Sequence, residues 1–115
     1  MNLDQFVSDK NLRNMWIQER DIDVYVRKSI RMLDRSTTAT PCLDIGSVEV
    51  HEDRRGQGVF KAFLDRFEKE AKKLNRAVYI ESIMEARLVK FLKSRGYAFV
   101  RDSSDLAPNM FKIPS

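Results

Sequence analysis

The sequence predicts one α/β domain over residues 1–115, built on a mixed, mostly antiparallel sheet. Three observations lead to this prediction. Segments of alternating or continuous apolar residues recur along the chain and indicate strands. Two of them, residues 43–50 and 77–80, flank a strongly amphipathic helical segment at 58–74. The short apolar segment after that helix suits a buried parallel neighbour of the earlier strand, so we expect a right-handed crossover between them.

The N-terminal third predicts a helix and then a long strand. Helical spacing of apolar residues indicates a helix at 8–19, with Ser8 as its N-cap and a short helical turn ahead of it. From Ile22 the apolar residues recur at every second position, which is typical of a strand with one solvent-exposed face. Lys28 interrupts the apolar face and indicates a bulge or an edge. The apolar residues behind these predictions are Leu3, Phe6 and Val7 in the turn, Leu12, Met15 and Trp16 in the helix, and Ile22, Val24, Val26, Ile30 and Met32 in the strand.

The central segment joins two further strands to the amphipathic helix. A polar loop at 34–41 precedes the strand at 43–50, in which Gly46 indicates a bulge or a close approach of the backbone. The loop at 51–57 then leads into the helix at 58–74. The apolar stripe of that helix consists of Val59, Phe60, Phe63, Leu64, Phe67, Ala71 and Leu74.

The last third repeats the order of strand and helix. After the strand at 77–80 we expect a helix at 84–94. Gly96 ends this helix. A strand at 97–101, a turn at 102–105 and a returning strand at 109–113 complete the predicted fold.

Composition limits the classes of function. Apolar residues make up 43% and charged residues 33% of the chain, which is ordinary for a globular protein and argues against disorder. Cys42 is the only cysteine and His51 the only histidine, so an internal disulfide, a cysteine metal cluster and a histidine-rich metal site are excluded. We therefore expect no metal. No apolar run is long enough to span a bilayer, and the first residues lack the regions of a secretory signal. We expect a cytoplasmic protein with no membrane partner.

The loop before the long helix is the most informative segment for function. A strand, two glycines (Gly56 and Gly58) and the start of a helix follow one another, an order that presents several free backbone N–H groups to one anion. Arg54 and Arg55 add positive charge beside them. The segment favours a phosphate or pyrophosphate site. The alternative is a tight strand-to-helix turn without a ligand.

Two motifs resemble those of the GNAT N-acetyltransferase superfamily. Its motif A reads Arg/Gln-x-x-Gly-x-Gly/Ala after a strand that ends in valine. Arg55 matches its first position and Gly58 its second, whereas Phe60 stands where Gly or Ala is usual. Arg95-Gly96-Tyr97 is similar to the Gly-Phe of motif B. The order and the spacing match over about half of the chain, from residue 43 to residue 100.

The resemblance implies a GNAT-like sheet with helices on both faces and a splayed pair of parallel strands. It also implies acetyl-CoA as co-substrate, bound in the opening between residues 43–50 and 77–82. The backbone near Val48 and Val50 would pair with the pantetheine arm, and the amides of residues 55–60 would hold the pyrophosphate. The candidate cofactor-binding residues are Val48, Val50, Arg54, Arg55, Gly56, Gln57, Gly58, Val59, Phe60 and Glu85.

Three positions depart from the family pattern and concern catalysis. Leu92 stands where many members carry a tyrosine as general acid, Glu85 where an asparagine is common, and Phe60 where the phosphates meet a small residue. An amine must lose a proton before it attacks a thioester. Glu49, at the end of the splayed strand, is the candidate catalytic base. The other carboxylates near the opening are Asp44 and Glu81, and the remaining titratable candidates are His51, Tyr79 and Tyr97.

Two functions stay open. The first is an N-acetyltransferase that moves an acetyl group from acetyl-CoA to an amine on a small molecule or a protein. The second is a catalytically degenerate GNAT-fold module that docks on a protein or a nucleic acid. Basic residues cluster on and after the strand that begins at Ile22, but we favour a charged outer face of the sheet over a nucleic-acid interface. These residues are Arg27, Lys28, Arg31 and Arg35, with Tyr25 on the same face as Arg27 and Arg31.

Overall fold

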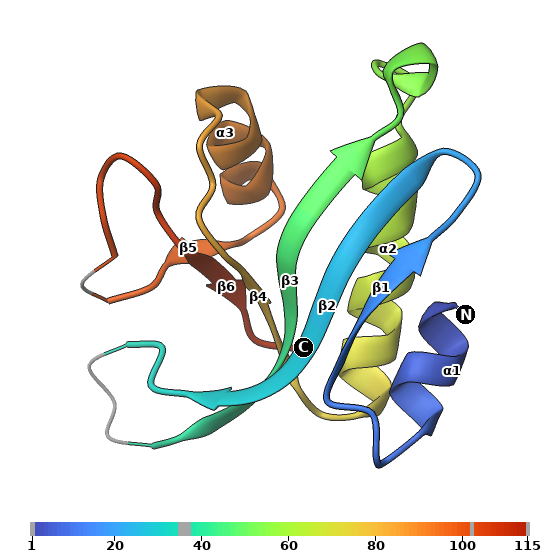
Figure 1. Ribbon diagram of the computed structural model, residues 1–115. Helices are drawn as coiled ribbons and strands as arrows, with labels where there is room; N and C mark the ends of the chain where they lie inside the picture. The colour runs from blue at the N-terminus through green and yellow to red at the C-terminus, as the bar shows by residue number, and fades with distance from the viewer. Residues whose placement is uncertain (1, 35–37, 102, 115) are drawn as a thin grey trace.

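The computed structural model describes residues 2–34, 38–101 and 103–114. They form a six-stranded sheet in the order β1-β2-β3-β4-β6-β5 (Figure 1). Only β3 and β4 pair in parallel, and the other neighbours in the sheet are antiparallel. The predicted mixed, mostly antiparallel α/β fold is therefore confirmed. The strands are β1 (Asn14–Gln18), β2 (Ile22–Arg31), β3 (Thr40–Val50), β4 (Ala77–Ile80), β5 (Ala98–Phe99) and β6 (Met110–Lys112).

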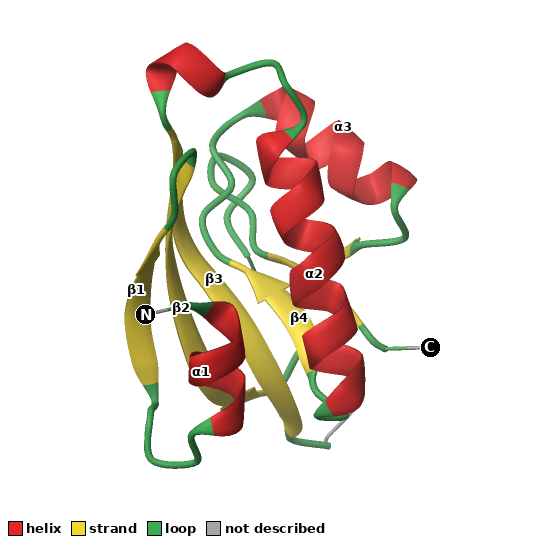
Figure 2. Cartoon of the chain, turned by 90° about the vertical axis from the view of Figure 1, so that its right-hand side faces the viewer, coloured by secondary structure: helices red, strands yellow, loops and turns green. Residues whose placement is uncertain are grey.

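The helices α1 (Leu3–Ser8), α2 (Val59–Lys73) and α3 (Ala86–Ser94) contribute to one main core. Phe6, Phe67 and Leu92, one from each helix, are all fully buried in it. Figure 2 shows the three helices on the same side of the sheet. A second, smaller cluster has no helix residue and is built around Cys42 and Tyr79. This distribution differs from the expected helices on both faces. Successive right-handed crossovers that proceed in one direction along a sheet place their helices on the same side.

The predicted helix at 8–19 is wrong, whereas the short helix before Ser8 is confirmed. Ser8 is the last residue of α1, and the N-cap is Asn2, whose side chain accepts a hydrogen bond from the Gln5 N–H at 3.0 Å. Residues 14–18 form β1, in which Ile17 is buried and Trp16 is half exposed. Pairing with β2 satisfies the backbone of this short segment, and tertiary contacts of this kind override helical spacing.

The long strand β2 is confirmed, but its apolar face ends early. Ile22, Val24 and Val26 are buried as expected. Ile30 and Met32 are 71% and 51% exposed, because β2 and β3 continue past the helices as a two-stranded extension (Figure 1).

The bulge in this part of the sheet lies on β3 and not at Lys28. Tyr25 pairs with Ser47 and Val26 with Ile45, so Gly46 is the extra residue, as the sequence predicted. A Cβ atom at Gly46 would lie 3.1 Å from the Tyr25 ring, which explains why a glycine suits this position.

The remaining elements follow the prediction with shorter ends. The helix predicted at 58–74 is α2 (Val59–Lys73), and β4 lies beside β3 in parallel as expected. The helix predicted at 84–94 begins only at Ala86, and the strands predicted at 97–101 and 109–113 shorten to β5 and β6. The predicted loop at 34–41 includes Thr40 and Pro41, which belong to β3. Arg35 and residue 102 lie outside the described residues. No helix in the described ranges is long and apolar enough to cross a membrane.

Candidate functional site

The parallel strands β3 and β4 separate halfway along β3. Their ladder runs from the pair Cys42–Ala77 to the pair Ile45–Ile80. One further hydrogen bond follows, from the Glu81 N–H to the Ile45 carbonyl at 3.0 Å. Beyond it β3 continues to Val50 as the partner of β2, while the chain after β4 turns toward α3 (Figure 1). The sequence-predicted opening between the two strands is therefore present.

The glycine loop lies at the end of β3 and opens toward solvent. Gly56 and Gly58 have φ angles of +78° and +74°, a region that glycine adopts without strain. Gly58 is the N-cap residue of α2, and no side chain caps the helix there. A Cβ atom added at either glycine would meet no atom within 4 Å. The first backbone N–H groups of α2 thus face a space that an anion can enter.

Contacts with the β1–β2 turn hold the loop in place. The His51 N–H donates to the Asp21 carbonyl at 2.9 Å, and the Arg54 Nε lies 3.1 Å from the Asp21 carboxylate. The His51 ring contacts the Arg20 carbonyl through Nδ1 at 2.8 Å and the Asp23 carboxylate through Nε2 at 3.3 Å. His51 therefore has a structural role at the base of the loop.

A hollow of about 400 Å³ extends from this loop to α3. We call it the loop groove. Its charged lining residues are Arg54, Arg55, Lys61 and Arg87 and the single carboxylate Glu85, so the lining has an excess of positive charge. Asp21 pairs with Arg54 and Asp65 with Lys61 from outside the groove. The helix dipole of α2 adds to this positive potential. The residues lining the loop groove are Val50, Arg54, Arg55, Gly56, Gly58, Val59, Phe60, Lys61, Glu85, Arg87, Leu88 and Phe91.

The groove brings together most of the sequence-predicted cofactor residues and adds four others. Gln57 is not among its lining residues, because its side chain amide donates to the Asp53 carbonyl at 3.3 Å. Val48 lies on β3 and packs against the core. Sequence reasoning missed Lys61, Arg87, Leu88 and Phe91 as site residues. The crossover topology could have revealed them, because it brings the start of α2 and the start of α3 to the same edge of the sheet.

Phe60 forms part of the wall of the groove and does not fill it. Its side chain is half-buried and packs against the main core. The space in front of Gly56 and Gly58 stays open. The aromatic ring at this position is therefore compatible with a ligand at the start of α2.

The three carboxylates considered as catalytic bases lie in different surroundings. Glu49 is exposed and pairs with Asp23 across β2 and β3, and it does not line the loop groove. Glu81 lies at the point where β3 and β4 separate, with the Arg27 guanidinium 3.0 Å away. Asp44 is fully buried.

Asp44 is the centre of an ion cluster on the face of the second core cluster. Its carboxylate accepts hydrogen bonds from the Ser29 hydroxyl at 2.8 Å and the Arg31 guanidinium at 2.9 Å, and the Arg27 Nε lies at 3.4 Å. Desolvation disfavours the charged form of Arg31, but the hydrogen bond and charge of Asp44 outweigh it, so the pKa of Arg31 is raised. The Arg31 guanidinium also stacks 3.9 Å above the Tyr79 ring. Arg27 and Arg31 are thus engaged within the protein, which supports the charged-face interpretation of this basic cluster.

Neither Leu92, which stands where the family carries its general-acid tyrosine, nor the nearby Tyr97 is placed to donate a proton, because both belong to the packed interior. Leu92 is fully buried in the main core. Tyr97 is also buried, and its hydroxyl donates to the Glu68 carboxylate at 2.7 Å. Burial, and then the hydrogen bond to Glu68, raise the pKa of Tyr97 well above its usual range. Tyr97 is therefore a poor proton donor and instead helps to join α3 to α2.

A scan against models of protein families found no match for this chain, and a search of curated proteins found none either. Solved structures do resemble it. The Y144F mutant of the toxin AtaT, bound to the C-terminus of the antitoxin AtaR and acetyl-CoA, matches with a TM-score of 0.64 at 13% identity over 82% of this chain. The match spans only 59% of the AtaT chain.

Two other neighbours match more of their own length. The ribosomal-protein-S18-alanine N-acetyltransferase from Escherichia coli has a TM-score of 0.62 at 16% identity, over 97% of this chain and 76% of the enzyme. The anti-CRISPR protein AcrVA5 has a TM-score of 0.57 at 18% identity, over 88% of this chain and all of AcrVA5. The sheet order, the separated parallel strands and these neighbours show that this chain has the fold of the GNAT acetyltransferases.

Proposed function

We propose that this chain binds acetyl-CoA in the loop groove and transfers its acetyl group to an amine. The observation that carries the proposal is the basic groove at an uncapped helix start, which extends from Val50 at the end of β3 to the start of α3. In this arrangement the amides of residues 55–60 hold the diphosphate, with Arg54, Arg55, Lys61 and Arg87 around it. The backbone of β3 near Val48 and Val50, which faces the opening, pairs with the pantetheine arm.

The proposed reaction is a direct attack of the amine on the thioester. The amine nitrogen bonds to the carbonyl carbon, and a backbone N–H of β3 near Val48 stabilises the tetrahedral oxyanion. The carbon–sulfur bond then breaks and sulfur leaves as the thiolate. The proton of the amine passes to Glu49 through water, and water protonates the thiolate in place of the tyrosine that Leu92 replaces. The products are an amide and free CoA.

The buried position of Leu92 also supports a second function, a GNAT-fold module that docks on a macromolecule without transfer. Two structural neighbours were solved with a macromolecule: KacTA in a complex with DNA, and the AtaT Y144F mutant bound to the C-terminus of AtaR. Mass spectrometry separates the two functions. Mixing the chain with acetyl-CoA and its captured partner gives a mass increase of about 42 Da per transferred acetyl group only if transfer occurs.

Acetyl-CoA binding is the first experiment. At about one hundred times its dissociation constant, a ligand of the folded state adds about 2.7 kcal/mol of stability, which a thermal unfolding assay detects. Arg55→Glu reverses a charge in the groove without touching the core, because Arg55 is exposed and its guanidinium Nε donates to the Val50 carbonyl at 3.2 Å. We expect this variant to lose most of the stabilisation.

The matched control is Arg13→Glu, the same change at an exposed position before β1, opposite Lys28 and far from the loop. It should keep the full acetyl-CoA effect. An unmodified chain that gains no stability from acetyl-CoA, or equal losses in the two variants, would show that the groove does not bind this cofactor.

A further inference from the structure

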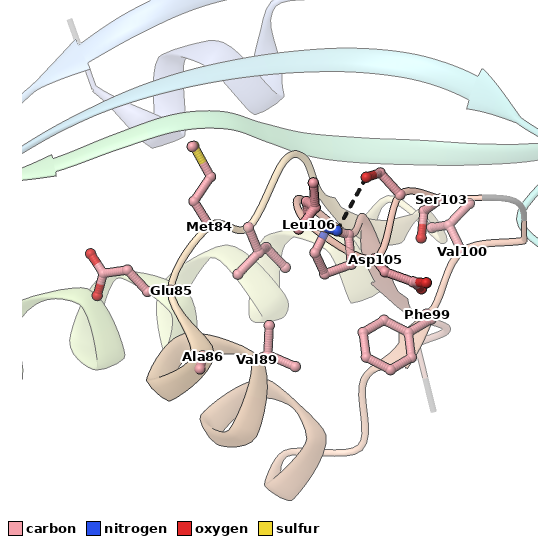
Figure 3. A pocket seen from close by; sticks show the side chains of 12 residues that line it. Met84, Glu85, Ala86, Val89, Phe99, Val100, Ser103, Asp105 and Leu106 are labelled. Atoms are coloured by element: carbon pink, nitrogen blue, oxygen red, sulfur yellow. Dashed lines mark hydrogen bonds between the residues drawn. The ribbon is translucent and has the colours of Figure 1, made fainter.

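A second hollow, of about 430 Å³, lies on the other side of α3. We call it the α3 pocket. Figure 3 shows its apolar walls, with Val89 of α3 facing Phe99 across the hollow. Val100 and Pro108 close the pocket from the segment between β5 and β6, and Ile83 closes it from the end of β4. The two hollows thus flank the start of the same helix.

Large apolar side chains stand exposed around this pocket. Leu106 is 89% exposed, Met84 81% and Phe99 44%. The Leu106 N–H donates to the Ser104 hydroxyl at 3.2 Å, which fixes the backbone that carries the leucine at the rim (Figure 3). Scattered exposed apolar residues need no explanation, but a group of them around one hollow marks an interaction site. A methionine at the rim adapts its shape to different ligands.

The charged residues that line the α3 pocket are both acidic. They are Glu85 and Asp105, whereas the loop groove carries four cations. The nearby Lys93 does not line the pocket, and its ammonium lies 4.5 Å from the centre of the Phe99 ring. Glu85 lines both hollows and therefore lies between them. The pocket attracts a cation with an apolar part, and the groove attracts an anion.

We propose that the α3 pocket binds the acceptor, a peptide segment in which an amine lies beside a large apolar side chain. The inference rests on the proposed acetyl transfer. The apolar side chain fills the space between Val89, Phe99 and Leu106, and the ammonium group lies toward the Glu85 carboxylate at one end of the pocket. The Asp105 carboxylate at the opposite end adds to the negative potential of the pocket (Figure 3). Because Glu85 also borders the loop groove, a peptide held in this way presents its amine at the side where acetyl-CoA is proposed to bind.

Peptide binding without any cofactor tests this proposal directly. The probes are two blocked tripeptides, acetyl-Leu-Lys-Leu-amide and acetyl-Asp-Lys-Asp-amide, titrated into the isotope-labelled chain and followed by backbone NMR. We expect the leucine peptide to shift the amides of residues 83–86 and 103–106 and the aspartate peptide to leave them unchanged. Leu106→Ser should weaken the leucine peptide at least about tenfold, the effect of losing one buried leucine contact. Asp105→Asn should weaken it less and reduce its salt dependence.

Ile30→Ser is the matched control, because Ile30 is a similarly exposed apolar residue on β2, outside the lining of the α3 pocket. It should bind the leucine peptide as the unmodified chain does. No shift at millimolar peptide, equal binding of both peptides, or equal binding of blocked lysine alone overturns the proposal.

A separate titration with acetyl-CoA, read at residues 54–60, tests the cofactor groove independently. Binding of acetyl-CoA without peptide binding leaves the proposed function standing and refutes the peptide site. Peptide binding in a chain that never binds acetyl-CoA refutes the acceptor role.

Discussion

Removing the buried carboxylate of Asp44 should destabilise the protein strongly. Asp44 is fully buried and compensates the positive charges of Arg27 and Arg31, and it also accepts the Ser29 hydroxyl. Asp44→Ala leaves the Arg31 guanidinium without its carboxylate partner, whereas Arg27 keeps its ion pair with Glu81 at 3.0 Å. Breaking a buried ion pair by removing one member costs about 3–5 kcal/mol. The two arginine side chains are 26% and 30% exposed, so water compensates them partly and we expect the lower end of this range, about 3 kcal/mol.

A loss of this size is easy to measure. For a domain of about this length, each kcal/mol lowers the Tm by about 4 °C, so Asp44→Ala should lower it by about 12 °C. Urea unfolding followed by circular dichroism gives the free energy of unfolding directly. The matched control is Glu49→Ala, which removes an exposed carboxylate from the same strand and should change stability by no more than about 0.5 kcal/mol. If Asp44→Ala costs less than about 1 kcal/mol, the ion cluster does not hold β2 to β3 as we argue.

Three further changes test the loop and the junction between the helices. Desolvation lowers the pKa of His51, but hydrogen bonds to Asp23 and to a backbone carbonyl outweigh it, so the pKa in the folded state is raised. The stability that His51 adds should therefore be present below about pH 6.5 and lost as the pH rises through the pKa of the folded state. In a His51→Ala variant the Tm should depend less on pH between about pH 5 and pH 8. Gly56→Ala should cost about 1–2 kcal/mol in urea unfolding, because its φ is +78°, although a methyl group there meets no neighbour. Tyr97→Phe should cost about 1–2 kcal/mol in the same assay, since it removes the hydrogen bond to the carboxylate of Glu68, and an unchanged midpoint would contradict that role.

The sequence predicted the elements that carry a long or repeated pattern. The apolar stripe of α2, from Phe63 to Ala71, is unambiguous over several turns, and the structure reproduces it. The segment at 8–19 failed because only Leu12, Met15 and Trp16 suggested a helix, and three residues within two turns are too few to establish a period. Its pairing with β2, which decides the matter, is a contact between distant residues that local periodicity does not contain.

In the candidate site, too, the sequence predicted the features that depend on neighbouring residues and missed those that depend on contacts between distant ones. The glycine loop could be recognised because Gly56 and Gly58 act through their own backbone angles. The contribution of α3 could not, because Arg87 and Phe91 reach the groove only through the crossover that follows β4. Likewise, Asp44 looked like a possible base in the sequence, and only the three-dimensional contacts with Arg31 show that its charge is already compensated.

The extra residue in β3, Gly46, determines which face of the sheet each later side chain of that strand occupies. Side chains alternate along a strand, so a single inserted residue exchanges inside for outside from that point on. With Gly46 present, Val48 and Val50 turn toward the core and Glu49 toward water. Deleting Gly46 would restore a regular ladder and at the same time present Glu49 to the apolar interior. The loop that follows would then start from the opposite side of the sheet, so the position of one glycine governs the orientation of every residue between it and α2.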